Sequence, residues 1–405
     1  MKIRSLFLSL FLGSLLSGCI NTLDDSQVIA LDVAKLYTER DIRLEEIADI
    51  TYLQLDDRDE KFLFRGNIGA ISSTYLIGSD PRSGDILFFT RDGKPKHKFN
   101  RKGGGPEEYS QLFTFIYDEE KDELFVHERN KIRVYNSSGE YKRVFSLPPE
   151  SFVMNDYALL DDRSIVLFDM NLKSKANMRH MRLHEDIEER QEVINEHESS
   201  FIRLSVLDGH VEEYIKVPED FFGVDLTVLD ESSGSPRKIV GRTYHLIRHQ
   251  EGLLLHNHET DTVYLYKRDH TLVPYMVQTP SVKSLNPGIY INTVVDRGNY
   301  QFIELQTLRV KLPGPLLTTH LVRDKKSGAV FTPVITMKDF KGKEMTINRN
   351  TVQCIQNANE GLLTFTVDEL REAYDAGRLS GELKSFVEQM EEENENDVLV
   401  MLRFK

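Results

Sequence analysis

A hairpin-like pattern of 14 residues recurs four times in this chain and constrains its fold more than any other feature. Each copy begins with a β-branched residue, carries a turn residue at its eighth position and ends on a large apolar residue. The copies span residues 86–99, 132–145, 202–215 and 263–276, and a weaker fifth spans 321–334. Short apolar runs on both sides of a turn residue are typical of β-hairpins. We therefore expect a repeated antiparallel unit.

Further apolar strands precede several copies, at residues 74–77, 123–126 and 252–256. Three or four antiparallel strands per unit result, and such sheets bury both faces when they stack radially, as in a β-propeller. The long gap between the second and third copies contains residues 164–168 (SIVLF), which we interpret as a strand of a further, degenerate blade. The sequence thus predicts an all-β fold.

Helical patterns are few and lie near the two ends of the chain. Residues 36–49 suggest a short lead-in helix, and Thr366 with Glu369 forms a possible capping box before apolar residues at helical spacing. We expect a helical insertion there. The apolar residues 398–404 (VLVMLRF) are suited to complete the last or the first blade, which would close the ring.

The N-terminus has the three parts of a secretion signal over residues 1–18, with Lys2 and Arg4 before an apolar run. It ends in Leu-Ser-Gly-Cys, which resembles the lipobox of bacterial lipoproteins and makes Cys19 the expected lipidation site. The alternative is that Cys19 is an ordinary small residue of a cleaved signal peptide. A lipid anchor would place the protein on a membrane, as an outer-membrane lipoprotein of the cell envelope, on either its periplasmic or its surface face.

Charge and cysteine content exclude several classes of protein. The formal net charge of −14 disfavours nucleic acid as a partner. Cys354 is the only other cysteine, so with Cys19 acylated no intrachain disulfide can form, and a four-cysteine zinc site is excluded. Stability must come from packing.

Residues 47–112 resemble the first blade of the six-bladed β-propeller lipoproteins of Bacteroidota, which are relatives of NHL-repeat propellers. Four features carry the resemblance: residues 50–55 (ITYLQL), the turn at 91–94 (RDGK), Phe99 and the glycine-rich stretch 101–109 (RKGGGPEEY). The resemblance implies one propeller of six four-stranded antiparallel blades. The expected domain boundaries are a signal peptide over 1–18, a lipidated tether and lead-in over 19–46, and the propeller over 47–405.

Two groups of residues are candidate sites. Arg101 and Lys102 flank the triple glycine and would bind a ligand if their loop lies at the mouth of the central channel, with His127 and Arg129 reaching the same mouth. The alternative is a tight inter-blade loop and a solvated strand end. His256 and His258 share a face if both lie on one strand, so they could bind a divalent metal with a carboxylate. Two strands with a turn are the simpler interpretation.

The function that these features favour is a non-catalytic binding or scaffold module for an envelope protein, peptide or glycan partner. The alternative, by analogy with other six-bladed propellers, is a calcium- or zinc-dependent hydrolase or lyase with its metal in the central channel. A weaker third option is a ligand sensor beside an outer-membrane transporter. The sequence contains neither G-x-S-x-G nor H-E-x-x-H, and it leaves the enzyme question open.

Overall fold

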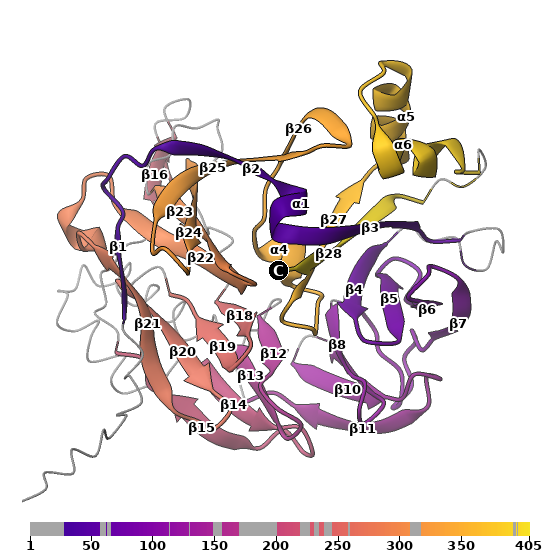
Figure 1. The fold of residues 1–405 in the computed structure, drawn as a ribbon. Coiled ribbons are helices and arrows are strands. Elements are labelled where there is room, and N and C mark those ends of the chain that lie inside the picture. The colour runs from indigo at the N-terminus through magenta and orange to yellow at the C-terminus, as the bar shows by residue number, and fades with distance from the viewer. Residues whose placement is uncertain are drawn as a thin grey trace, which may run out of the picture.

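Six sheets stand in a ring around a central axis (Figure 1), which confirms the six-bladed β-propeller. The computed structural model describes residues 28–56, 62, 66–112, 114–128, 130–148, 156–169, 201–218, 227–230, 235–238, 245–257, 260–307, 317–391, 394 and 396–405. Within these residues, no helix is both long enough and apolar enough to cross a bilayer.

The first three blades are four-stranded antiparallel sheets whose strands follow chain order from one edge to the other. Blade 1 contains β4 (Asn67–Ile71), β5 (Tyr75–Asp80), β6 (Asp85–Thr90) and β7 (Pro95–Asn100). Blade 2 contains β8 (Thr114–Asp118), β9 (Glu123–Glu128), β10 (Lys131–Tyr135) and β11 (Tyr141–Ser146). Blade 3 contains β12 (Tyr157–Leu159), β13 (Ser164–Phe168), β14 (Phe201–Ser205) and β15 (Val211–Ile215).

Blades 4 and 5 have the same four-stranded core, and each gains a parallel strand from the N-terminal segment. Blade 4 contains β18 (Leu246–His249), β19 (Gly252–Leu255), β20 (Thr262–Lys267) and β21 (Leu272–Thr279), with β1 (Ile29–Asp32) along β21. Blade 5 contains β22 (Ile289–Arg297), β23 (Tyr300–Thr307), β24 (Thr318–Asp324) and β25 (Val330–Met337), with β2 (Glu39–Arg43) and β26 (Phe340–Met345) along β25. The expected 19–46 tether thus supplies edge strands in its described part.

Blade 6 closes the ring by joining the two ends of the chain. It contains β27 (Glu360–Phe365), β28 (Val398–Phe404) and β3 (Ala48–Gln54). β28 pairs antiparallel with β3 over its whole length, which confirms that residues 398–404 close the ring. Residues 50–55, predicted to begin the first blade, therefore belong to the last one; that prediction is wrong in its blade assignment, because the sheet is completed from both termini.

Helices are short and lie beside the sheets. α1 (Leu44–Ile47) is the lead-in helix, shorter than predicted because residues 39–43 form β2. α5 (Val367–Asp375) and α6 (Gly381–Glu388) form the predicted insertion between β27 and β28, and Thr366 caps α5 by accepting a hydrogen bond from the Glu369 backbone N–H at 3.2 Å. The other short elements are α4 (Arg349–Val352), the 3-10 turn η2 (Val282–Ser284) and the separate hairpin of β16 (Thr227–Asp230) and β17 (Ser235–Lys238).

The 14-residue repeat is the outer hairpin of each of the first five blades. Its turn residue has a positive φ in every copy, at Gly93 (83°), Gly139 (83°), Gly209 (74°), His270 (67°) and Gly328 (71°). Packing adds a second requirement at Gly139, where a Cβ would come within 2.5 Å of the Phe99 ring. Phe99 is the last residue of the preceding copy. The turn of one copy therefore contacts the last residue of the copy before it, and this contact joins neighbouring blades.

The interior consists of apolar layers between neighbouring blades. One layer joins blades 1 and 2, the next joins 2 and 3, another joins 3 and 4, and a larger one joins blades 4 to 6 with the inserted helices. The ring is closed by the layer in which Leu53 of β3 packs with Leu76 and Leu87 of blade 1. Residues 164–168 form β13 within blade 3, so the prediction that they belong to a separate, degenerate blade is wrong. Residues 169–200 separate β13 from β14 in the sequence, so blade 3 is formed from a longer stretch of the chain than blades 1 and 2.

Candidate functional site

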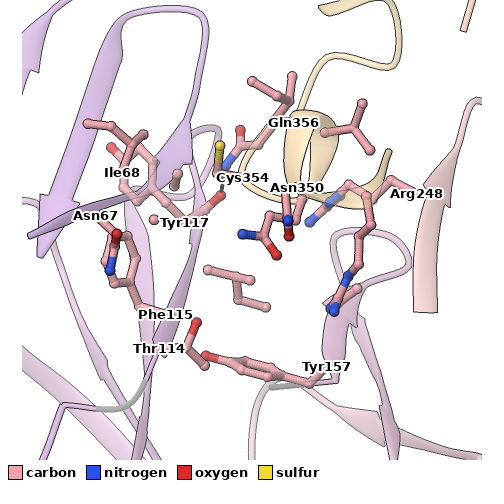
Figure 2. A pocket seen from close by; sticks show the side chains of 18 of the residues that line it. Asn67, Ile68, Thr114, Phe115, Tyr117, Tyr157, Arg248, Asn350, Cys354 and Gln356 are labelled. Carbon is pink, nitrogen blue, oxygen red and sulfur yellow. Dashed lines mark hydrogen bonds between the residues drawn. The ribbon is translucent and has the colours of Figure 1, made fainter. Parts of the chain in front are cut away.

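A cavity of about 460 Å³ lies at the centre of the ring (Figure 2). Its wall is formed by β4, β8, β12 and β18, the edge strands with which blades 1 to 4 begin, and by α4 with the residues that follow it. Each contributing strand comes from a different blade, so side chains far apart in the sequence meet here. This volume lies within the range of about 300–1,000 Å³ that is typical of small-molecule sites.

The short helix α4 is held in this position by its own N-terminal sequence, Asn-Arg-Asn-Thr. The Asn348 side chain accepts a hydrogen bond from the Asn350 backbone N–H at 2.9 Å, and the Thr351 hydroxyl accepts one from the Asn348 N–H at 3.2 Å. Such a reciprocal cap satisfies amide groups that a helix start leaves open. It fixes the direction in which Arg349 leaves the backbone.

Arg349 ties α4 to blades 3 and 4 through a buried ionic network. Its Nη2 lies 3.0 Å from Oδ1 of Asp156, and Nδ1 of His245 lies 2.9 Å from Oδ2 of the same carboxylate. The His245 ring also stacks on Phe168 with 3.5 Å between centroids. Burial alone would raise the pKa of Asp156, but the hydrogen bond from His245 and the charges of His245 and Arg349 lower it overall. Asp156 therefore stays ionised and anchors both partners.

His256 lies beside this network and is 2% exposed. Its Nε2 accepts a hydrogen bond from the Val294 backbone N–H at 3.0 Å. Burial, followed by the positive neighbours His245 and Arg349, lowers the pKa of His256 to about 3. The ring is therefore neutral at pH 7, and its Nδ1 has no hydrogen-bond partner among the described residues.

Arg248, on β18, is the other charged residue among the described residues that line the cavity. Figure 2 shows its side chain extending into the space between α4 and Tyr157. The guanidinium makes no hydrogen bond or ion pair with a described residue. Burial, together with the charge of Arg268, lowers the pKa of Arg248 to about 10 against the opposing charge of Asp118, which leaves it a cation at pH 7.

Arg297, at the end of β22, adds a second incompletely paired guanidinium nearby. It is 1% exposed, and its Nη1 donates to the carbonyl oxygen of Arg248 at 3.2 Å. Its Nε and Nη2 are buried and have no hydrogen-bond partner within the part of the chain that the structure describes. Burial, with a smaller contribution from the charge of Arg248, lowers the pKa of Arg297 to about 10 against the opposing charge of Asp296.

The remaining described lining combines polar, aromatic and aliphatic residues and contains no acidic side chain. Open carboxamides come from Asn67, Asn350 and Gln353, which are solvent-exposed, and no side-chain hydrogen bond joins them to a described residue. Aromatic rings come from Phe115, Tyr117 and Tyr157. No carboxylate or imidazole is among the described residues of the lining.

Cys354 is the one thiol in this lining. Burial raises its pKa to about 12, so it is a protonated thiol at pH 7. A catalytic cysteine needs the thiolate, which positive neighbours or a helix N-terminus would stabilise. Cys354 is therefore a packing residue, consistent with its place in the apolar layer between blades 6 and 1.

The glycine-rich loop places the predicted ligand residues Arg101 and Lys102 outside the cavity lining. The Arg101 Nε donates to the Gly139 carbonyl oxygen at 2.7 Å, and the Lys102 Nζ donates to the Arg82 carbonyl oxygen at 2.6 Å. An internal hydrogen bond also holds the loop, since the Gly105 N–H donates to Glu108 Oε2 at 2.8 Å. This geometry is that of a tight inter-blade loop, and ligand binding by it stays a prediction.

The histidine predictions have a mixed outcome. His127 is 1% exposed, and its ring lies 5.3 Å from the Tyr157 ring, so it packs between blades 2 and 3, and ligand binding by it stays a prediction. Arg129 and His258 lie outside the described residues, as does the lipidation site Cys19. Among the described residues, no three His, Cys, Asp or Glu side chains lie close enough together to hold a metal ion. The pairing of His256 with His258 is therefore untested.

The residues that do line the cavity were missed because they come from separate segments. Asn67, Thr114, Tyr157 and Arg248 lie in four different blades, and no local spacing connects them. One signal was available for Arg248: it is a charged residue that follows two apolar residues within the short strand Leu-Ile-Arg-His, with which a blade begins. Such a residue faces the axis at a cost in desolvation, and function is the usual reason.

Comparisons with known proteins agree on the fold. The family model described as "Domain of unknown function (DUF4934)" matches residues 28–403. The chain is similar to a solved structure described as an exported protein from Bacteroides fragilis, with 15% identity, a TM-score of 0.60, and coverage of 94% of this chain and 100% of that one. No curated protein matches the sequence.

Two further solved structures are similar at TM-scores below 0.5. One is a member of the DUF4221 family from Bacteroides vulgatus, with 13% identity, a TM-score of 0.47, and coverage of 89% of this chain and 97% of that one. The other is a streptogramin B lyase, with 10% identity, a TM-score of 0.37, and coverage of 89% and 99%.

Proposed function

This chain belongs to the DUF4934 family, and from that premise we propose that it is a non-catalytic binding module of the cell envelope whose ligand enters the central cavity. The observation that carries the proposal is the chemistry of the lining. Guanidinium groups, carboxamides and aromatic rings recognise ligands, whereas general acid–base catalysis needs a group that titrates near the working pH. The described lining has no such group, since Arg248 stays charged and Cys354 stays protonated at neutral pH.

The location proposed for this module is the outer membrane, with a lipid on Cys19 as its anchor. Two observations support it: the signal-like N-terminus with its lipobox, and the similarity in fold to a Bacteroides fragilis protein described as exported. We place the chain with the lipoprotein propellers that are related to NHL-repeat proteins. The partner would be an envelope protein, a peptide or a glycan that presents its recognised group to the cavity.

The binding role is tested with a fractionated extract of small molecules and oligosaccharides from the cell envelope. The full-length protein, purified in detergent, is incubated with the extract, and the retained compounds are identified by mass spectrometry. We expect a compound that is recovered chemically unchanged and is no longer retained by Asn350→Trp, which fills the cavity from an exposed position on α4. Conversion of the compound would instead favour the hydrolase or lyase alternative.

The anchor is tested separately by metabolic labelling with an alkyne-bearing fatty acid. We expect label on the wild-type protein and its loss in Cys19→Ser, with the protein moving from the membrane to the soluble fraction. Unchanged fractionation of Cys19→Ser would contradict the lipid anchor and leave the binding role standing.

A further inference from the structure

Building on the proposed function, we infer that the cavity ligand is a small polyhydroxylated carboxylate, such as a hexuronic acid, whose carboxylate binds Arg248. The first argument is charge. The chain carries a net charge of −14, yet both charged residues among the described residues that line its central cavity are arginines. An overall acidic protein repels anions in general, so a local positive site in it selects an anion specifically.

The second argument is the state of the two arginines. Arg349 is already neutralised by Asp156 at 3.0 Å, so it is part of the wall. Arg248 has no such partner among the described residues, and a half-buried unpaired charge is costly. An anionic ligand would remove that cost. Arg297 lies behind Arg248 and not in the described lining: it is 1% exposed and its Nη1 donates to the Arg248 carbonyl oxygen, so Arg248 is the guanidinium that a ligand can reach.

The third argument concerns the kind of anion. A guanidinium offers two parallel N–H groups whose spacing matches the two oxygens of a carboxylate or of a phosphate. One available guanidinium balances one negative charge, which a carboxylate supplies, whereas a phosphate monoester carries close to two near neutral pH. The single free cation in the described lining therefore favours the carboxylate.

The fourth argument concerns the rest of the ligand. The open carboxamides of Asn67, Asn350 and Gln353 each offer N–H donors and a carbonyl acceptor, which suit neighbouring hydroxyl groups. Phe115, Tyr117 and Tyr157 border the cavity from within the layers between blades, where they are 2%, 3% and 7% exposed, and they give the wall an apolar side that the C–H groups of a sugar ring can contact. A cavity of about 460 Å³ has room for a ligand of one or two sugar units.

The test uses calorimetric titration of the full-length protein in detergent with three matched probes. D-glucuronate carries the carboxylate, D-glucose lacks it, and glucose 6-phosphate replaces it with a dianion. We expect glucuronate to bind at least about 30-fold more tightly than glucose, because a charge-assisted bidentate hydrogen bond is lost in glucose. Glucose 6-phosphate is expected to bind more weakly than glucuronate.

Variants assign the effect to Arg248. Arg248→Met should lower the affinity for glucuronate about 30-fold, to the level of glucose. Arg248→Lys should lower it about tenfold, because the charge remains but the two parallel N–H donors of the guanidinium are lost. Arg403→Met is the matched control, since Arg403 is exposed on β28 and this variant removes the same charge. It should bind glucuronate like the wild type, and melting curves establish that all variants fold.

Each other outcome overturns the inference. Equal affinities for glucuronate and glucose would exclude recognition of the carboxylate, and tighter binding of glucose 6-phosphate would make the site one for phosphate. Unchanged affinity of Arg248→Met would exclude Arg248. If none of the probes binds, the inference fails. The proposed function is then decided by the experiment with the envelope extract. An uncharged compound that the wild type retains and Asn350→Trp does not retain would support the proposed function without the inference.

Discussion

Two arginines line the same cavity in opposite states. Arg349, at the start of α4, is held by Asp156 and, through it, by His245, so that one side chain joins α4 to two blades. Arg248, on β18, reaches into the cavity without a hydrogen bond or ion pair to a described residue. We infer that the difference separates stability from function: the paired guanidinium stabilises the cavity wall, whereas the unpaired one lowers stability and is available to a ligand.

The largest expected effect is on the paired side. Arg349→Met removes one partner of a buried ion pair and leaves the charge of Asp156 uncompensated. We expect the free energy of unfolding to fall by about 3–5 kcal/mol. Urea denaturation of the full-length protein, followed by circular dichroism, measures the change against Arg403→Met, which should lie within about 0.5 kcal/mol of the wild type.

A double variant sharpens this prediction. Asp156→Leu combined with Arg349→Met removes both charges, and we expect it to recover a large part of the lost stability, because an apolar pair of similar size needs no compensation. A double variant less stable than Arg349→Met would show that the network contributes more than its charges.

The second effect is a dependence on pH that arises on the paired side, at His256. The pKa of His256 is about 3 in the folded protein and about 6.5 when unfolded, so the unfolded chain takes up a proton first as pH falls. Stability is therefore intact above pH 6.5 and declines as pH falls towards 3. This histidine should account for about 2 kcal/mol between pH 7 and pH 5.

His256→Gln tests this, because its side-chain oxygen can still accept the hydrogen bond from Val294 but cannot titrate. Denaturation at several pH values should give a flatter profile for the variant than for the wild type. Asp156, whose lowered pKa protects it until the pH falls below its unfolded value of about 3.8, should add a steeper loss only there in both proteins. Parallel profiles for the two proteins between pH 7 and pH 5 would contradict the assignment.

The smallest effect is on the unpaired side and has the opposite sign. Arg248→Met replaces a half-buried, unpaired cation by an apolar side chain of similar length, and we expect the free energy of unfolding to rise by about 1 kcal/mol. The same denaturation series measures it. A loss of more than 1 kcal/mol would place Arg248 with Arg349 among the structural residues.

The fold was predictable because its evidence is local and repeated. A turn glycine such as Gly139 needs a positive φ and contacts Phe99 of the preceding copy, so the same two positions recur along the chain. The assignment of strands to blades failed where this regularity breaks. β13 is separated from β14 by a long insertion, and β3 pairs with the far C-terminus, neither of which a repeat pattern can reveal.

The site was not predictable from local sequence patterns, because a propeller builds its central cavity from residues of separate blades. Blades 1 to 4 each contribute residues of their first strand to the cavity and α4 contributes others, and the other strands of the blades lie between these segments in the sequence. The glycine-rich loop at Arg101 drew attention because its residues are adjacent, yet its polar groups bind its own turn and neighbouring backbone. A lone charge in an axial strand, as in Arg248, is the weaker signal that points to the cavity.

The most direct test of the two-arginine comparison is a set of melting curves for the wild type and Arg248→Met, with and without D-glucuronate. Because a ligand that binds only the folded state raises the melting temperature, the wild type should shift upwards with glucuronate. Arg248→Met should melt higher than the wild type without ligand and, because it binds glucuronate about 30-fold more weakly, should shift far less than the wild type. A variant that melts lower than the wild type and still shifts with glucuronate would contradict the claim that Arg248 is kept for the ligand.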